Sequence, residues 1–151
     1  PSMSWTILRP VSFMDSFLPG FIGKVFMTMI RDTMGQKRMQ YIAVSDIGFF
    51  AACAFTTPAQ WTSRAISLAG DELTFDELNK AFVEATGREI ETTFGFLGAA
   101  LKYGVPEIRD MVTWVKEVGY KADIAELRKI HPDLMTVTSY LRQKSQTSGS
   151  S

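Results

Sequence analysis

Residues 5–10 of the chain read WTILRP, and Phe13 and Met14 follow shortly after. The β-branched and aromatic side chains of this run predict a short strand that starts at Trp5. Proline cannot donate a backbone hydrogen bond to the middle of a ladder, so we expect the strand to stop at Pro10. Because the chain enters a strand almost at its first residue, we also expect part of the fold to lie upstream.

Strands and helices alternate through the first half of the chain, and helices dominate the second half. This order predicts an α/β fold. The strands are too few for a complete dinucleotide-binding sheet, which has about six. Besides the first strand, the predicted strands are 39–44, 65–68 and 89–93, and the predicted helices are 19–30, 45–55, 74–86, 94–103, 106–118, 123–130 and 132–142, with a turn over 31–37.

Several predicted helices carry capping signals at their ends. Thr74 and Glu77 have the spacing of a capping box, in which each side chain accepts a hydrogen bond from the other residue's backbone amide. Gly87 stands where a C-terminal glycine cap belongs. Asp46 and Asp123 are predicted to cap their helices by accepting from the first free amides.

Composition excludes several classes of function. Sixteen basic residues balance sixteen acidic ones, so the chain lacks the basic excess of a general nucleic-acid binder. Its single cysteine and single histidine, Cys53 and His131, cannot form an internal disulfide or a Cys/His zinc site. The longest apolar run, residues 49–55, is too short to cross a bilayer. We therefore expect no metal, no direct nucleic-acid contact and no membrane span, and a cytoplasmic or nuclear location.

No catalytic residue is assigned. Tyr140 and Lys144 match the Y-x-x-x-K pair of dehydrogenases, in which the lysine lowers the tyrosine pKa. They lie in the last predicted helix, where an edge aromatic and a solvated lysine are the expected roles. His131 precedes Pro132 and is expected to cap or pack a turn. Cys53 has no cationic neighbour nearby in the sequence, so a buried structural thiol is expected.

The stretch over residues 13–30 is rich in phenylalanine and methionine. Three interpretations are open: core packing, an adaptable apolar wall for a ligand or partner, and a surface that packs on a missing part of the fold. Core packing together with contact between domains is the interpretation we favour.

Five segments together resemble one family. The WTILRP run resembles the segment after the active-site helix of extended and atypical short-chain dehydrogenase-like proteins. Residues 44–48 (VSDIG) resemble a later strand-to-helix step of the same proteins. Three further segments resemble NmrA-like members of that group: residues 68–74 (LAGDELT), 120–124 (YKADI) and 127–132 (LRKIHP), and all five stand in the family's order. The matches run from about Trp5 to Leu141.

This resemblance implies a Rossmann-type fold that binds NADP(H) or NAD(H). Residues 1–144 would form its C-terminal portion, the last strands of the sheet plus a mostly helical smaller lobe. Residues 145–151 are small and polar, so we expect them to form a disordered tail. In the family, the loop after the Arg-Pro element lines the nicotinamide pocket. Carried over by position, the cofactor-binding residues are Pro10, Val11, Ser12 and Phe13.

The chain departs from the family in one respect. Its eleven glycines include no G-x-G-x-x-G turn to hold a pyrophosphate. The N-terminal dinucleotide-binding half is therefore missing, and we expect this chain alone to bind the cofactor weakly. The resemblance implies first a redox-sensing regulator that binds NADP(H) and acts through a protein partner. The alternatives are an NAD(P)H-dependent oxidoreductase of a small organic substrate, whose pocket this lobe forms, and a cofactor-free interaction module.

Overall fold

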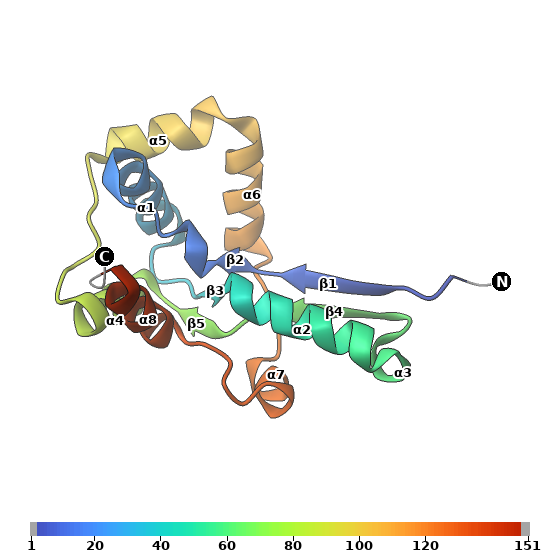
Figure 1. The fold of residues 1–151 in the computed structure, drawn as a ribbon. Coiled ribbons are helices and arrows are strands. Elements are labelled where there is room, and N and C mark those ends of the chain that lie inside the picture. The colour runs from blue at the N-terminus through green and yellow to red at the C-terminus, as the bar shows by residue number, and fades with distance from the viewer. Residues whose placement is uncertain (1–2, 149–151) are drawn as a thin grey trace.

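The computed structural model describes residues 3–148 of the chain (Figure 1). Its strands are β1 (Thr6–Pro10), β2 (Ser12–Phe13), β3 (Met39–Ile42), β4 (Arg64–Leu68) and β5 (Asp71–Leu73). Its helices are the 3-10 turn η1 (Met14–Ser16), α1 (Gly20–Met34), α2 (Val44–Thr56), α3 (Pro58–Trp61), α4 (Phe75–Thr86), α5 (Gly95–Gly104), α6 (Pro106–Glu117), α7 (Ile124–Ile130) and α8 (Val137–Ser148).

The strands form two small sheets, which confirms the α/β prediction. β1 pairs in parallel with β4, and the Val11 amide donates to the Leu68 carbonyl at 3.2 Å just beyond the end of β1. β3 pairs in parallel with β2 and antiparallel with β5. Figure 1 shows β1 and β4 extending away from the helices α1, α5 and α6, with α2 beside them.

Strand β3 separates two hydrophobic cores, and all four of its residues are buried. Met39 and Tyr41 belong to the core under α1, α4, α6 and α8. Ile42 belongs to the core between β4, α2 and α7. The Gln40 side chain donates to the Ala122 carbonyl and accepts from the Ala122 amide, each at 3.0 Å, so it joins β3 to the chain before α7.

Helix α5 crosses α1 at Gly98. A Cβ atom at this position would lie 2.9 Å from the Met29 backbone nitrogen, which is closer than real contacts allow. The glycine lowers the intrinsic helix propensity of α5 but lets the two backbones approach.

The predicted strand over residues 89–93 is wrong, because side chains take up its amides. The Ile90 amide donates to Asn79 Oδ1 on α4 at 2.7 Å, and the Thr93 amide donates to Thr28 Oγ1 on α1 at 2.8 Å. The predicted turn over residues 31–37 is also too long, since α1 continues to Met34.

The capping predictions for Thr74 and Asp123 are confirmed. The prediction for Asp46 is wrong. Helix α2 begins at Val44, whose amide donates to Asp15 Oδ2 at 2.9 Å, so a residue from η1 caps this helix.

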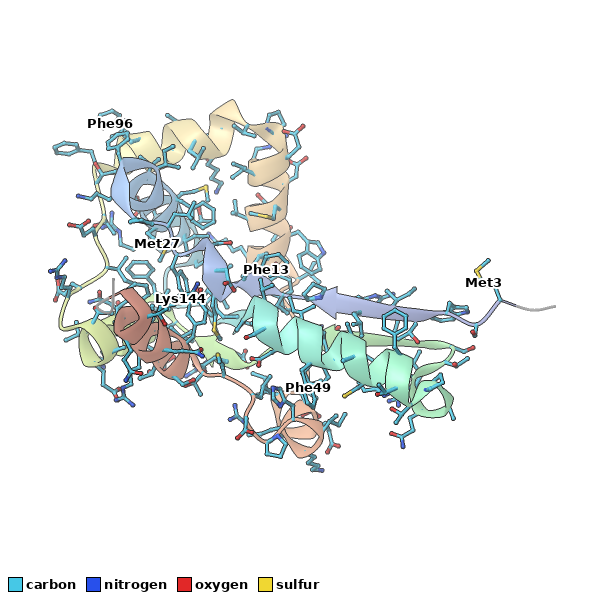
Figure 2. The ribbon with its side chains drawn as sticks, in the orientation of Figure 1. Met3, Phe13, Met27, Phe49, Phe96 and Lys144 are labelled. Atoms are coloured by element: carbon cyan, nitrogen blue, oxygen red, sulfur yellow. The ribbon has the colours of Figure 1, made fainter. Side chains whose placement is uncertain are left out.

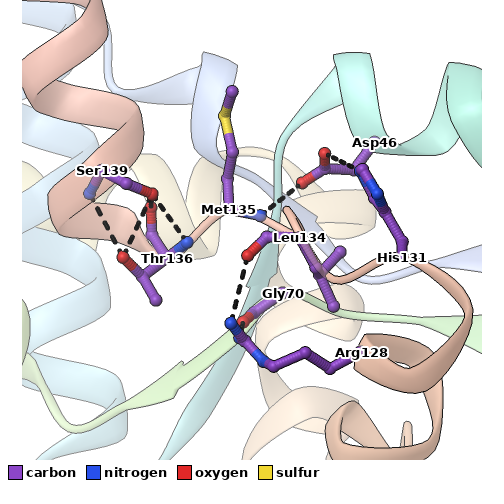
Figure 3. A network of polar contacts seen from close by, with 8 residues as sticks. All are labelled: Asp46, Gly70, Arg128, His131, Leu134, Met135, Thr136 and Ser139. Carbon is purple, nitrogen blue, oxygen red and sulfur yellow. Dashed lines mark hydrogen bonds and ion pairs between the residues drawn. The ribbon is translucent and has the colours of Figure 1, made fainter.

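Asp46 instead holds the loop between α7 and α8 (Figure 3). Its carboxylate is buried and accepts from the Met135 amide at 3.0 Å, and its other oxygen lies 3.0 Å from His131 Nε2. The His131 ring stacks on Phe49 with centroids 3.9 Å apart, which confirms that the histidine packs a turn. Arg128 donates to the carbonyls of Leu134 and Gly70 in the same network.

The last helix starts later and ends later than predicted. Thr136 and Ser139 bond reciprocally through side chains and amides, and α8 begins between them at Val137 instead of Pro132. It continues to Ser148, so residues 145–148 of the predicted disordered tail are helical. Residues 149–151 lie outside the described part of the chain.

Replacing Asp46 by alanine should lower the free energy of unfolding by about 1–3 kcal/mol, because the amide of Met135 and the ring of His131 lose their acceptor. Asp133→Ala is the matched control, since Asp133 is an exposed aspartate of the same loop, and it should change stability by less than about 0.5 kcal/mol. Urea unfolding measures both. Equal effects would show that Asp46 does not hold the loop.

Gly98→Ala should destabilise the fold by about 1–3 kcal/mol, because the clash with the α1 backbone outweighs the gain in helix propensity. Gly48→Ala, in the interior of α2, adds a Cβ atom with nothing within 4 Å and should stabilise by about 0.5–1 kcal/mol. Thermal unfolding of the two variants checks the sign. A stabilising Gly98→Ala would rule out the close crossing of α1 and α5.

Candidate functional site

An apolar cavity of about 230 Å³ lies between helices α1 and α6 and strands β2 and β3. Phe13 on β2 and Met27 on α1 are two of its lining residues and are labelled in Figure 2. The lining residues are Val11, Ser12, Phe13, Ser16, Phe17, Phe26, Met27, Ile30, Met39, Tyr41, Met111 and Tyr120. None of them carries a charged side chain.

Val11, Ser12 and Phe13, three of the four residues carried over as nicotinamide contacts, line this cavity, whereas Pro10 does not. Val11 is 5% exposed and its amide is already bonded to Leu68, while Phe13 is 42% exposed. Strand β2 uses the backbone of Ser12 and Phe13 for pairing with β3. Residues 11–13 therefore line the cavity with their side chains, while hydrogen bonds to both sheets fix their backbone.

The stretch over residues 13–30 forms much of the remaining wall. Met27 and Ile30 are buried in the core and also line the cavity, and Phe17 and Phe26 pack against the same core. Met111 on α6 completes the wall. Core packing and an adaptable apolar wall are thus two roles of the same side chains.

The sequence analysis missed two tyrosines, Tyr41 and Tyr120, which line the cavity. Burial is the main cause that raises the pKa of Tyr41, and the nearby Asp71 carboxylate raises it further. Tyr41 is therefore a neutral phenol at physiological pH, able to donate a hydrogen bond. The signal was present in the sequence: a strand over 39–44 places Met39 and Tyr41 on one face.

Tyr140 and Lys144 lie outside the cavity lining. Lys144 Nζ lies 5.6 Å from the centre of the Tyr140 ring and 4.0 Å from Asp15 Oδ1. Burial and then the Asp15 carboxylate raise the pKa of Tyr140 to about 12. A proton-transfer pair needs a lowered tyrosine pKa, so the raised pKa of Tyr140 agrees with a structural role. Tyr140 is buried, however, and not at an edge.

Cys53 is half-buried, whereas a buried thiol was expected. It lines a second cavity, of about 460 Å³, between α2, β4 and α7.

Within residues 3–148, no three His, Cys, Asp or Glu side chains lie close enough together to bind a metal ion. None of the helices in that range is both long and apolar enough to span a bilayer.

Comparison with known proteins agrees with this architecture. The model of the NmrA-like family matches residues 6–141. Agroclavine dehydrogenase from Claviceps purpurea is 32% identical over 97 residues, which is 60% of this chain and 33% of that enzyme. The chain thus spans about a third of that curated relative.

Two solved structures share the fold. A nucleoside-diphosphate-sugar epimerase from Staphylococcus aureus superposes with a TM-score of 0.64 at 20% identity, over 93% of this chain and 52% of that one. A mutant of NmrA superposes with a TM-score of 0.52 at 15% identity, over 91% and 51%. The fold is therefore a portion of a Rossmann-type architecture, about half of each of these chains. With the family model matching nearly its whole length, the chain belongs to the NmrA-like family.

Proposed function

We propose that this chain forms the substrate-side lobe of an NAD(P)(H)-dependent oxidoreductase that acts on a small apolar organic molecule. The observation that carries the proposal is the apolar cavity, whose wall includes Val11, Ser12 and Phe13, the segment carried over as the nicotinamide contact. The similarity to a dehydrogenase supports the same reading.

The residues present fit one end of the cofactor. A planar nicotinamide ring suits the apolar side chains of Val11 and Phe13 beside the cavity. The phosphate end has no counterpart here, because no G-x-G-x-x-G turn occurs in the sequence. Tight binding of NADP(H) or NAD(H) therefore depends on a further polypeptide segment.

Strand β1 is the place proposed for that segment. Among the described residues β1 pairs with β4 alone, so its other edge is open. Trp5 and Ile7 are 48% and 45% exposed beside it. A parallel strand added here would pair the backbone groups of the open edge. The dinucleotide-binding half of the fold is the partner we infer for this edge.

NAD(P)H, when bound, supplies the hydride for reduction of the substrate. The residues of this chain bind and orient the substrate. The apolar cavity wall disfavours water, and the hydrogen bond from the Val11 amide to the Leu68 carbonyl fixes the segment that would border both the substrate and the nicotinamide ring. Two tyrosines belong to this wall, Tyr41, which is buried, and Tyr120, which is half-buried.

The second candidate is the redox-sensing regulator, located in the cytoplasm or nucleus. One observation favours it: among the described lining residues, none is a carboxylate, histidine, lysine or cysteine that could titrate near neutral pH. A protein of this kind would bind NADP(H) and signal to a protein partner without turnover.

Consumption of NADPH distinguishes the two candidates. The protein expressed from its complete gene is assayed by absorbance against a panel of apolar ketones, aldehydes and quinones. The oxidoreductase predicts turnover, and Met111→Trp, which fills the cavity from α6, should lower kcat/KM by about tenfold or more.

Val83→Trp is the matched control, because Val83 on α4 is 42% exposed, as Met111 is 43% exposed, and lies outside the cavity. Turnover that Met111→Trp leaves unchanged would place the substrate elsewhere. NADPH binding without turnover on any substrate would reject the oxidoreductase in favour of the regulator.

A further inference from the structure

A groove of about 850 Å³ adjoins the apolar cavity. It lies between the first two turns of α1, the end of α4 and the loop that follows α4. Phe17 and Met27 line both the groove and the cavity, and no other residue of the described chain lines both. These two residues therefore mark the place where the two spaces meet.

The Phe17 ring packs against a wall residue of each space. Its centroid lies 5.7 Å from that of Tyr41, which lines the cavity, and 5.2 Å from that of Phe82, which lines the groove. Phe17 is half-buried and belongs to the loop between η1 and α1. Met27 has an unbranched side chain that adapts easily to a neighbour. The boundary between cavity and groove thus consists of one loop residue and one adaptable side chain.

The segment expected beside the nicotinamide ring meets the cavity alone. Val11, Ser12 and Phe13 line the cavity, and none of them lines the groove. At about 230 Å³ the cavity is below the range of about 300–1,000 Å³ typical of ligand sites, whereas the groove falls within it. A molecule too long for the cavity can continue past Phe17 and Met27 into the groove.

The groove lining defines the chemistry of the part of the ligand that lies outside the cavity. Its charged residues are two basic and two acidic ones, of which Lys24 pairs with Glu91 at 3.2 Å. Because the two signs balance here and the cavity lining carries no charge, an uncharged ligand suits both spaces. Large apolar residues also line the groove, namely Phe17, Leu18, Met27, Phe82 and Ile90.

We propose that the ligand of this lobe is a neutral, elongated, mainly apolar molecule that occupies both spaces. Its reacting carbonyl lies in the cavity beside residues 11–13, and its chain passes Phe17 and Met27 into the groove. The inference rests on the proposed function for the reaction, since it names the substrate class of the same site. It makes the residues of the groove determinants of substrate length.

A series of methyl ketones tests the proposal on the protein expressed from its complete gene, without NADPH. The probes are 2-hexanone, 2-octanone and 2-undecanone, and titration calorimetry measures their affinities. Affinity should rise by roughly two- to fourfold for each added methylene through the whole series, because the groove removes the longer chains from water. An affinity that stops rising beyond 2-octanone would overturn the proposal.

Leu18→Trp enlarges a side chain that lines the groove and not the cavity. It should lower the affinity for 2-undecanone by about tenfold and that for 2-hexanone by less than about twofold. Ile22→Trp is the matched control, because Leu18 and Ile22 are 59% and 74% exposed and Ile22 lines neither space. Equal effects of Leu18→Trp on the two ketones would overturn the proposal.

A second measurement needs no variant, so it decides the question even if Leu18→Trp fails to fold. Nuclear Overhauser contacts locate the two ends of 2-undecanone in the wild-type complex. The methyl group next to the carbonyl should contact the ring of Phe13, and the terminal methyl group should contact the ring of Phe82. Contacts of both ends with cavity residues alone, or the reverse orientation, would overturn the proposal.

These outcomes separate the inference from the proposed function. Binding that increases with chain length and is sensitive to Leu18→Trp, without NADPH consumption on any substrate, would keep the site and reject the oxidoreductase. NADPH consumption with equal kcat/KM for 2-hexanone and 2-undecanone would keep the oxidoreductase and reject the groove as part of its site.

Discussion

The burial of strand β3 on both faces is the constraint on which the rest of the structure depends. Four residues separate two hydrophobic cores and pair with β2 on one side and β5 on the other. On one face, Met39 and Tyr41 pack in the core under α1, α4, α6 and α8. On the other face, the Gln40 side chain forms its two hydrogen bonds with the backbone of Ala122. Since a shift of one residue would exchange the two faces, the register of β3 determines whether the cavity exists.

The site follows from this position. Strand β2 runs parallel to β3, so the segment from Val11 to Phe13 is held against the same apolar wall as Tyr41. The fold thereby brings three of the four residues expected near a nicotinamide ring to the lining of an apolar cavity. Family membership sets the fold, and the chemistry of the cavity supports an oxidoreductase of such a molecule.

Local patterns predicted the elements that depend on neighbours in the sequence. The capping box at Thr74, the cap at Asp123 and the strand before Pro10 agree with the structure. Two of the errors occurred where distant residues supply the bonds. Asp15 caps α2 from η1, and Asn79 and Thr28 bond amides that could otherwise have formed a strand. No sequence pattern marks such partners, and the cavity, assembled from β2, β3, α1 and α6, could not be predicted either.

The most direct test of the account is hydrogen exchange on the protein expressed from its complete gene, with and without NADPH. The account predicts that NADPH slows exchange in the segment after β1, around Ser12 and Phe13. Slower exchange confined to other parts of the chain, or no change in this chain while NADPH is bound, would contradict it. Either of those results would show that the apolar cavity does not lie beside the bound cofactor, and the proposal that this chain forms the substrate side of the reaction would be wrong.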